Sequence, residues 1–414
     1  MSATSNRTSS PPVATPTGLR RYIVVISHRT IRWAFLGSLI ARLTQTMVPL
    51  ALLLFARQQL GGFGGAGTVV AIYALTASFG FPVIGRMVDR RGPSVLIVAA
   101  IINAAGIIAI VMAPTGLIWP LAAIAGVSTP PLGAAIRSVF VRGFDRPSDQ
   151  ASAMSLDTIG TELMFISGPA LVAALVALAS PKTGLLLAVV VSLIGTGLFA
   201  ATAGRAKNEP TRAGNRSRGL WSLVPLLLIV AMQMSAIGFI EVAIIARAIE
   251  LNSASAAGVL LAIWAAGSVV GGLTFGARDW PGSVQKQCGV LLGLTALGFC
   301  TLVIGHNLAV LYPLMFLAGL AVSPSATTLA TICGRLAPPH NRTEAFTWLA
   351  SATGLGGAGG YALGGVLVSH TNAVTAFLTG AAIPVLAVVL VLALPTRRLS
   401  GATDDDTEDN APPT

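Results

Sequence analysis

Twelve stretches of about 20 predominantly apolar residues follow one another along this chain of 414 residues. A helix of about 20 apolar residues can cross the hydrocarbon core of a bilayer, so each stretch is long enough to be a transmembrane helix. Short connections and two polar tails make up the remainder, which leaves no room for a separate soluble domain. The stretches are residues 33–56, 67–86, 94–113, 117–137, 156–179, 183–203, 221–246, 256–277, 286–305, 308–333, 345–368 and 373–394.

The composition excludes other broad classes of protein. Charged residues make up 10% of the chain and hydrophobic residues 54%, whereas a soluble domain carries roughly a quarter charged residues. A net charge of +11 could suggest nucleic-acid binding, but the basic residues are scattered between apolar runs instead of clustered on one face. The sequence therefore predicts an all-α integral membrane protein that partners the lipid bilayer and no nucleic acid.

The basic residues predict the orientation of the chain. Of 26 Lys and Arg residues, Arg57, Lys182 and Arg247 lie in connections on one side, and Arg42 lies within the first stretch. The remaining 22 lie in the tails and connections of the opposite side. Cytoplasmic loops carry an excess of Lys and Arg, so we expect a cell-membrane protein with both termini in the cytoplasm.

The two tails differ in character. Residues 1–30 begin with a Ser/Thr/Pro-rich segment that lacks the apolar core of a signal peptide, and we expect a disordered cytoplasmic tail there. Residues 396–414 carry five acidic side chains and predict a solvated acidic tail on the same side.

The chain divides into two halves of six stretches each. A basic connection, residues 205–220, follows the sixth stretch, and the sequences on its two sides repeat weakly: Ala71-Ile72-Tyr73 resembles Ala262-Ile263-Trp264. Parallel repeats of this kind are typical of transporters in which one half rocks against the other. We therefore expect six-helix halves at 31–204 and 221–395, joined by a cytoplasmic linker.

One connection carries a motif. Between the second and third stretches the chain reads Gly85-Arg86-Met87-Val88-Asp89-Arg90-Arg91-Gly92. Gly-x-x-x-Asp-Arg-x-Gly in this position resembles the cytoplasmic signature of the major facilitator superfamily, and the resemblance extends over all twelve stretches. It implies the twelve-helix fold of that family. Pro93-Ser94 replaces the basic residues that follow in the family pattern, and the second-half copy, Gly276 to Trp280, is degenerate.

The resemblance implies a cytoplasmic gate at this connection. Gly85 and Gly92 permit a tight turn and close helix approach, and Asp89 can face a neighbouring helix N-terminus or an arginine. The loop acts as a latch in the family, which gives Asp89 and Arg90 gating roles, with Arg137 as a further candidate on the same side. Alternatively, these charges only set the orientation of the chain.

Other segments are similar to a bacterial drug- and metabolite-exporter-like branch of the family. They are residues 130–133, Gly168-Pro169 and residues 343–349. Exporters often continue the Gly-Pro pattern with paired glycines, whereas Val172-Ala173 stands here.

Ionisable residues inside the stretches are candidates for proton coupling, because each costs at least about 2.5–3.5 kcal/mol to insert. Arg42 and Glu162 lie at similar depths, so they could form a structural pair, or Glu162 could exchange protons as substrate competes for Arg42. Asp157 is expected near the mouth of the fifth stretch, where it could be interfacial. Glu241 could line an external cavity or reach outward with Arg247.

Four polar or aromatic residues are candidates for the substrate cavity. Gln45 and Gln233 lie in the first and seventh stretches, which line the path in the family, although they could equally join helices to one another. Trp264 and Trp348 could face apolar or cationic cargo or pack in the core.

The expected function is secondary transport: export of a small, amphipathic molecule in exchange for protons. An uptake symporter or a facilitator would share the same fold. No phosphate-binding Gly-x-x-x-x-Gly-Lys-Ser/Thr motif is present in the sequence. The alternatives of another class are a membrane-embedded enzyme, which would need a cluster of nucleophile, His and acid, and a sensor, which should carry a sizeable soluble domain; the sequence favours neither. We expect no metal and no cofactor, and a monomer is expected because one chain contains both halves.

Overall fold

The computed structural model of the protein describes residues 20–61, 63–144, 146–203, 223–253 and 256–393, and the regular elements in these ranges are all helices. In the first half they are α1 (Arg20–Ser27), α2 (Arg29–Leu60), α3 (Phe63–Arg91), α4 (Ser94–Met112), α5 (Ile118–Val127), α6 (Leu132–Gly143), α7 (Pro147–Leu178) and α8 (Pro181–Ala203). In the second half they are α9 (Val224–Glu250), α10 (Ala256–Gly276), α11 (Val284–Thr301), α12 (Leu308–Gly319), α13 (Val322–Leu336), α14 (Arg342–His370) and α15 (Ala373–Leu392).

The twelve predicted stretches correspond to twelve spans. Two are broken: α5 and α6 are separated at Pro130-Pro131, where proline nitrogens cannot donate hydrogen bonds, and α12 and α13 are separated at Leu320-Ala321. In the described ranges, eleven spans are long and apolar enough to cross a membrane. The twelfth is α14, which has 29 residues and is rich in glycine. The prediction of an all-α, twelve-helix membrane fold is confirmed.

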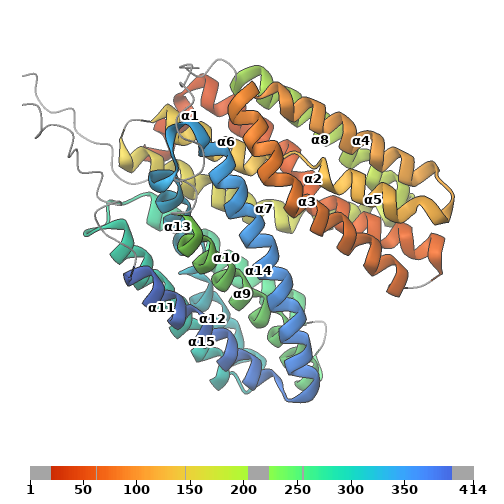
Figure 1. Cartoon of the computed structure of the whole chain (residues 1–414). Coiled ribbons are helices and arrows are strands. Elements are labelled where there is room, and N and C mark those ends of the chain that lie inside the picture. The colour runs from red at the N-terminus through yellow and green to blue at the C-terminus, as the bar shows by residue number, and fades with distance from the viewer. Residues whose placement is uncertain (1–19, 62, 145, 204–222, 254–255, 394–414) are drawn as a thin grey trace, which may run out of the picture.

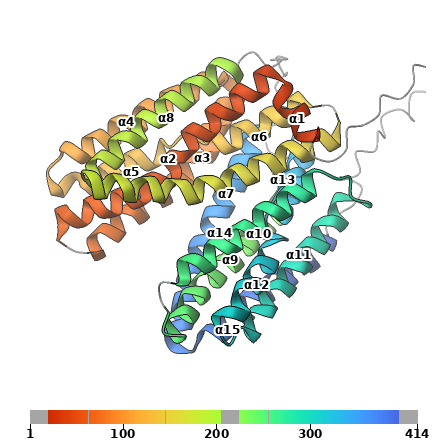
Figure 2. The ribbon, with the colours of Figure 1, turned by 180° about the vertical axis from the view of Figure 1, so that it is seen from behind.

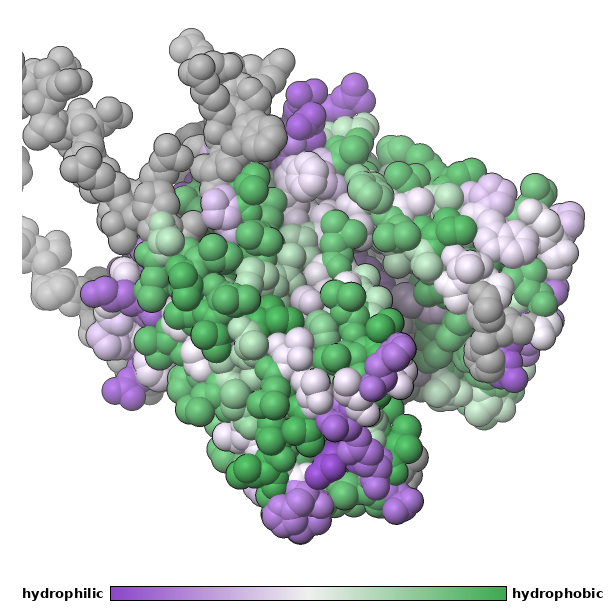
Figure 3. Space-filling view, turned by 60° about the horizontal axis from the view of Figure 1, so that its bottom comes forward, coloured by the Kyte–Doolittle hydropathy of each residue, from purple (hydrophilic) through white to green (hydrophobic). Residues whose placement is uncertain are grey.

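The helices form two bundles that meet at one end. Figures 1 and 2 show α2–α8 in one bundle and α9–α15 in the other, joined near α1, α6 and α13 and diverging from there. Across the junction α14 packs on α3 and α6, and α7 packs on α10 and α13. We call this the closed end and the opposite one the open end. Figure 3, with the open end turned forward, shows a hollow between the bundles.

The hydrophobic core reflects this arrangement. Near the open end each half has a core of its own, one around Met47 and Phe55 and the other around Phe299 and Phe377. A third cluster at the closed end contains residues from both halves, including Phe140 and Phe346. The halves therefore share a single core at the closed end and separate toward the open end.

Two differences from the sequence-based expectation concern the first half. Residues 20–30, expected in the disordered tail, form α1 and the start of α2, because Tyr22 and Val25 are buried against the protein. The helix α7 begins at Pro147 instead of near residue 156, since its polar first turns contact the other half and not lipid. The remainder of the expected N-terminal tail, the linker 205–220 and the acidic tail 396–414 lie outside the described residues.

Candidate functional site

A carboxylate of the first half caps a helix of the second half at the closed end. Asp89, near the end of α3, accepts hydrogen bonds from the backbone N–H groups of Thr343 (3.1 Å) and Glu344 (2.8 Å). These are the second and third residues of α14, and a helix N-terminus carries unpaired N–H groups and partial positive charge. Asp89 thus accepts hydrogen bonds from the unpaired N–H groups at the start of α14, across the junction between the halves.

An ion pair lies beside this cap. Arg86 donates from Nε (2.9 Å) and Nη2 (2.6 Å) to Oε1 of Glu344, whose side chain is only 1% exposed. The other carboxylate oxygen of Glu344 accepts from the Asn341 amide at 3.1 Å. We call Gly85, Arg86, Asp89, Thr343 and Glu344 the latch.

The glycines of the motif have distinct uses. A Cβ atom on Gly85 would lie 2.5 Å from Oγ1 of Thr347 and 3.2 Å from the Cα of Glu344, so only glycine lets α3 approach α14 this closely. Gly92 has a φ of 85°, which glycine adopts without strain. Arg90 is exposed and lies outside the latch contacts, while Arg86 and Glu344 are the latch partners that the motif did not identify. Glu344 could have been identified as a latch partner from its position, because it directly precedes the apolar stretch that begins at residue 345.

A second line of contacts joins α7 to α10, next to the degenerate copy of the motif. Ser152 Oγ donates to the carbonyl of Gly276 (2.7 Å), and Ser155 Oγ donates to that of Gly272 (2.5 Å). A Cβ on Gly276 would lie 2.6 Å from Cβ of Ser155, so glycine is again required for close approach. We call these residues the seam. It joins the halves through hydroxyl and carbonyl groups, whereas the latch uses charge.

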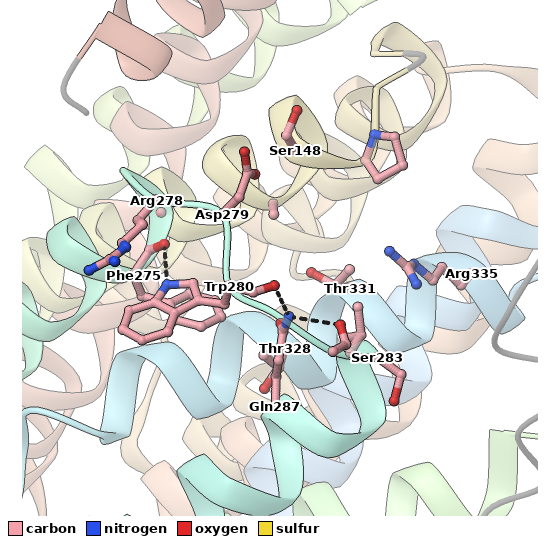
Figure 4. A pocket seen from close by; sticks show the side chains of 15 residues that line it. Ser148, Phe275, Arg278, Asp279, Trp280, Ser283, Gln287, Thr328, Thr331 and Arg335 are labelled. Atoms are coloured by element: carbon pink, nitrogen blue, oxygen red, sulfur yellow. Dashed lines mark hydrogen bonds between the residues drawn. The ribbon is translucent and has the colours of Figure 1, made fainter. Parts of the chain in front are cut away.

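A pocket of about 230 Å³ lies beside the seam. Figure 4 shows the start of α7, with Ser148, facing the loop that carries Asp279 and Trp280, and Arg335 of α13 on another side. The Trp280 indole stacks on Phe275 and donates to its carbonyl at 3.0 Å. The pocket is thus formed by both halves at the closed end.

A buried ion cluster lies within the first half. Asp157 is fully buried and accepts from Nη1 of Arg42 (2.5 Å) and from Nε of Arg137 (2.7 Å). Arg42 also donates to the hydroxyl of Thr161. Two expectations are therefore wrong: Arg42 pairs with Asp157 instead of Glu162, and Asp157 is buried instead of interfacial. Arg137, expected at the gate, is a member of this ion cluster.

Two other carboxylates, one on α7 and one on α9, have no basic partner among their described contacts. Glu162 of α7 accepts a 3.0 Å hydrogen bond from Ser268 of α10, across the junction. Glu241 of α9 accepts from the hydroxyl of Tyr361 on α14. Arg247 bonds to Glu250 and to the Gly305 carbonyl, so the alternative in which Glu241 reaches outward with Arg247 is not observed.

The four candidates for the substrate cavity lie in different parts of the protein. Gln45 donates to the Pro130 carbonyl at the break between α5 and α6 (3.4 Å), and buried Gln233 donates to Ser325 of α13. Trp264 is 7% exposed and packs on Phe299, which is a core position. Trp348 is 42% exposed. The described contacts do not bring these four side chains together.

Comparisons with known proteins extend these observations. The sequence model of the family described as Major Facilitator Superfamily matches residues 34–277 and 223–413. The human organic anion transporter MFSD10 (TETRAN) has a similar fold, with a TM-score of 0.71 and 17% identity over 88% of this chain and 99% of that one.

Two further solved structures are similar in fold. A bacterial homologue of the iron transporter ferroportin, in an outward-facing state, gives a TM-score of 0.68 with 16% identity over 90% of this chain and 100% of that one. The E. coli fucose:proton symporter FucP gives 0.67 with 15% identity over 92% and 99%. No curated protein matches the chain significantly in sequence.

Proposed function

Because this chain belongs to the major facilitator superfamily, we propose that it exports a small amphipathic molecule in exchange for protons. The chain is a multi-pass membrane protein and a secondary transporter of small molecules, not an enzyme. The direction of transport, the coupling ion and the amphipathic cargo are the parts of this proposal that go beyond membership of the family.

The closed end is the cytoplasmic end in this proposal. The end of α3 with Arg86, Arg90 and Arg91 lies there, and so does the end of α6 with Arg142, which fits the excess of basic residues in cytoplasmic loops. The structure then corresponds to an outward-facing state in the cell membrane. One chain holds both halves of the path, so the working unit is a monomer.

The contact between Glu162 and Ser268 carries the proposal of proton coupling. It joins α7 of the first half to α10 of the second half, so it must change when the halves rock. A carboxylate without a basic partner among its described contacts is costly when it is charged inside a span. Such a group is suited to bind a proton in one state and release it in the other.

The Arg42, Asp157 and Arg137 cluster has a structural role in this proposal. Asp157 is fully buried and contacts two guanidinium groups, so removing its charge would leave both without a counter-ion. We propose that this cluster holds α2, α6 and α7 together within the first half, while Glu162 and Glu241 respond to protons.

The experiment combines a cargo screen with a test of coupling. Cells with and without the protein are compared for accumulation of a panel of cationic, neutral and anionic amphipathic dyes, and the best cargo is then loaded into proteoliposomes. Efflux driven by an imposed pH gradient is expected for the native chain and is expected to be lost in Glu162→Gln. Glu250→Gln, at the Arg247–Glu250 pair near the end of α9, is the control.

Two outcomes contradict the proposal. Efflux that is indifferent to the pH gradient excludes proton exchange. Uptake in the same direction as the proton flux identifies a symporter instead.

A further inference from the structure

The first helix reaches the seam between the halves. The Tyr22 hydroxyl of α1 donates to the carbonyls of Leu273 (2.9 Å) and Gly272 (3.3 Å) on α10, and it lies 3.4 Å from Oγ of Ser155 on α7. Burial raises the pKa of the Tyr22 hydroxyl, so it remains a protonated donor. One side chain of α1 therefore contacts both halves where they close.

A glycine forms the wall of this site. A Cβ atom on Gly276 would lie 2.4 Å from the Tyr22 hydroxyl oxygen. Tyr22 is 6% exposed and Val25, one turn on, is 1% exposed. One face of α1 is therefore packed closely against the rest of the protein.

Next to its buried face, α1 exposes apolar side chains. Ile23 is 61% exposed and Ile26 is 42% exposed, and residues three apart lie on the same side of a helix. An extended residue, His28, separates α1 from α2, so α1 can turn away from the axis of the span. Figure 2 shows α1 at the closed end, above α7.

The charged residues of α1 and of the segments next to it in the sequence are all basic. The sequence contains no Asp or Glu before Asp89, and α1 begins with Arg20-Arg21. Arg29 is exposed, and the Arg32 guanidinium lies 5.7 Å from the ring centroid of Trp33, itself partly exposed. A helix with an apolar face flanked by basic residues lies at the boundary of headgroups and acyl chains, and basic residues near the surface attract anionic lipids. A second copy of the chain would present the same positive charge and be repelled.

We propose that α1 binds anionic phospholipid at the closed end and, through Tyr22, holds α7 against α10. Anionic lipid then stabilises the state in which the closed end is shut. The inference goes beyond the transport reaction and does not depend on its direction or coupling ion.

The test measures the conformational equilibrium of the full chain without any cargo. Spin labels are placed at the open end on Lys182→Cys and His306→Cys, with exposed Cys300 replaced by Ala, and label distances are measured by pulsed electron resonance. The protein is held in nanodiscs of phosphatidylcholine alone or with about 30 mol % phosphatidylglycerol. Anionic lipid is expected to raise the ratio of long to short distances by about fivefold.

Two sets of variants separate lipid binding from coupling. Ile23→Asn/Ile26→Asn is expected to lose the response to phosphatidylglycerol because the lipid-facing side is disrupted. Tyr22→Phe keeps that side and the ring but cannot donate to Leu273, and it is expected to lose the response as well. Met112→Asn, an exposed apolar residue at the open end (81% exposed), is expected to keep it.

The proposal is overturned if the native chain gives the same distances in both lipids, or if both sets of α1 variants respond like the native chain. Native mass spectrometry that shows a dimer dependent on Ile23 and Ile26 would also overturn it, since the face would then bind a second copy. Because no cargo or proton gradient is used, failure here is distinct from failure of the transport assay.

Discussion

At the scale of single residues, side-chain direction decides which charges meet. Asp157 and Glu162 are five residues apart on α7, which at 3.6 residues per turn places them about 140° apart around the helix. Only one can therefore face Arg42, and the structure shows that it is Asp157. Depth along the helix could be predicted from the sequence, but the direction could not, because it depends on how α7 is rotated against α2 and α10.

Replacing Asp157 by Asn is expected to destabilise the protein by about 3–5 kcal/mol, because two guanidinium groups would lose a buried counter-ion. The double variant Arg137→Gln/Asp157→Asn restores the net charge of the cluster and should recover part of that loss. Thermal unfolding of the purified proteins measures both. Equal losses in the single and double variants would show that charge balance is not the cause.

Replacing Asp89 by Asn is expected to favour opening of the closed end by about fivefold, because the charge at the start of α14 is lost while one acceptor oxygen remains. The rate of alkylation of a cysteine at Ser351, whose hydroxyl bonds to the Ser78 carbonyl across the junction, reports this opening. The control is Glu250→Gln, at an acid that accepts from the backbone N–H of Ala373 at the start of α15, within the second half. Similar rates in the two variants would contradict a latch role for Asp89.

At the scale of elements, the spans were predictable and their junctions were not. Runs of about 20 apolar residues fix a span wherever lipid surrounds it, and this located all twelve. The start of α7 was missed because Ser152 and Ser155 are polar in sequence but bond to α10 in the structure. The N-terminal cap of α14 was foreseen only as a possibility for Asp89, since its partner lies more than 250 residues away.

Substituting Gly85 by Ala tests the close approach of α3 and α14. The new Cβ would overlap Thr347, so the helices must separate and transport should fall several-fold while the protein stays folded. Gly67→Ala on the same helix meets nothing within 4 Å and is the matched control. Adding Thr347→Ala to Gly85→Ala should restore part of the activity; no recovery would show that the clash is not responsible.

At the scale of the whole molecule, the sequence is compatible with more than one arrangement of the halves, and the structure shows the arrangement closed at one end. Two such states differ by only a few kcal/mol, which residue patterns do not resolve. The halves themselves follow from the repeat and from the length of the chain, whereas their relative tilt follows from the latch, the seam and the shared core.

Joining the halves covalently at the closed end should stop transport. A short bifunctional thiol reagent applied to Ser78→Cys/Ser351→Cys is expected to abolish cargo movement in proteoliposomes, and reduction should restore it, because alternating access requires this junction to part. Ser78→Cys alone, treated in the same way, should remain active. Undiminished transport by the cross-linked chain would exclude rocking about this junction.

The core shared by the two halves has a thermodynamic consequence. Opening the closed end must separate apolar side chains of one buried cluster, to which Phe140 and Phe346 belong. Exposure of apolar surface to water carries a positive heat capacity. An Eyring plot of the turnover rate should therefore be curved if this opening limits the rate, with an activation enthalpy that changes with temperature. The turnover rate of such a transporter would then depend on temperature through a heat-capacity change, as the rate of a folding reaction does.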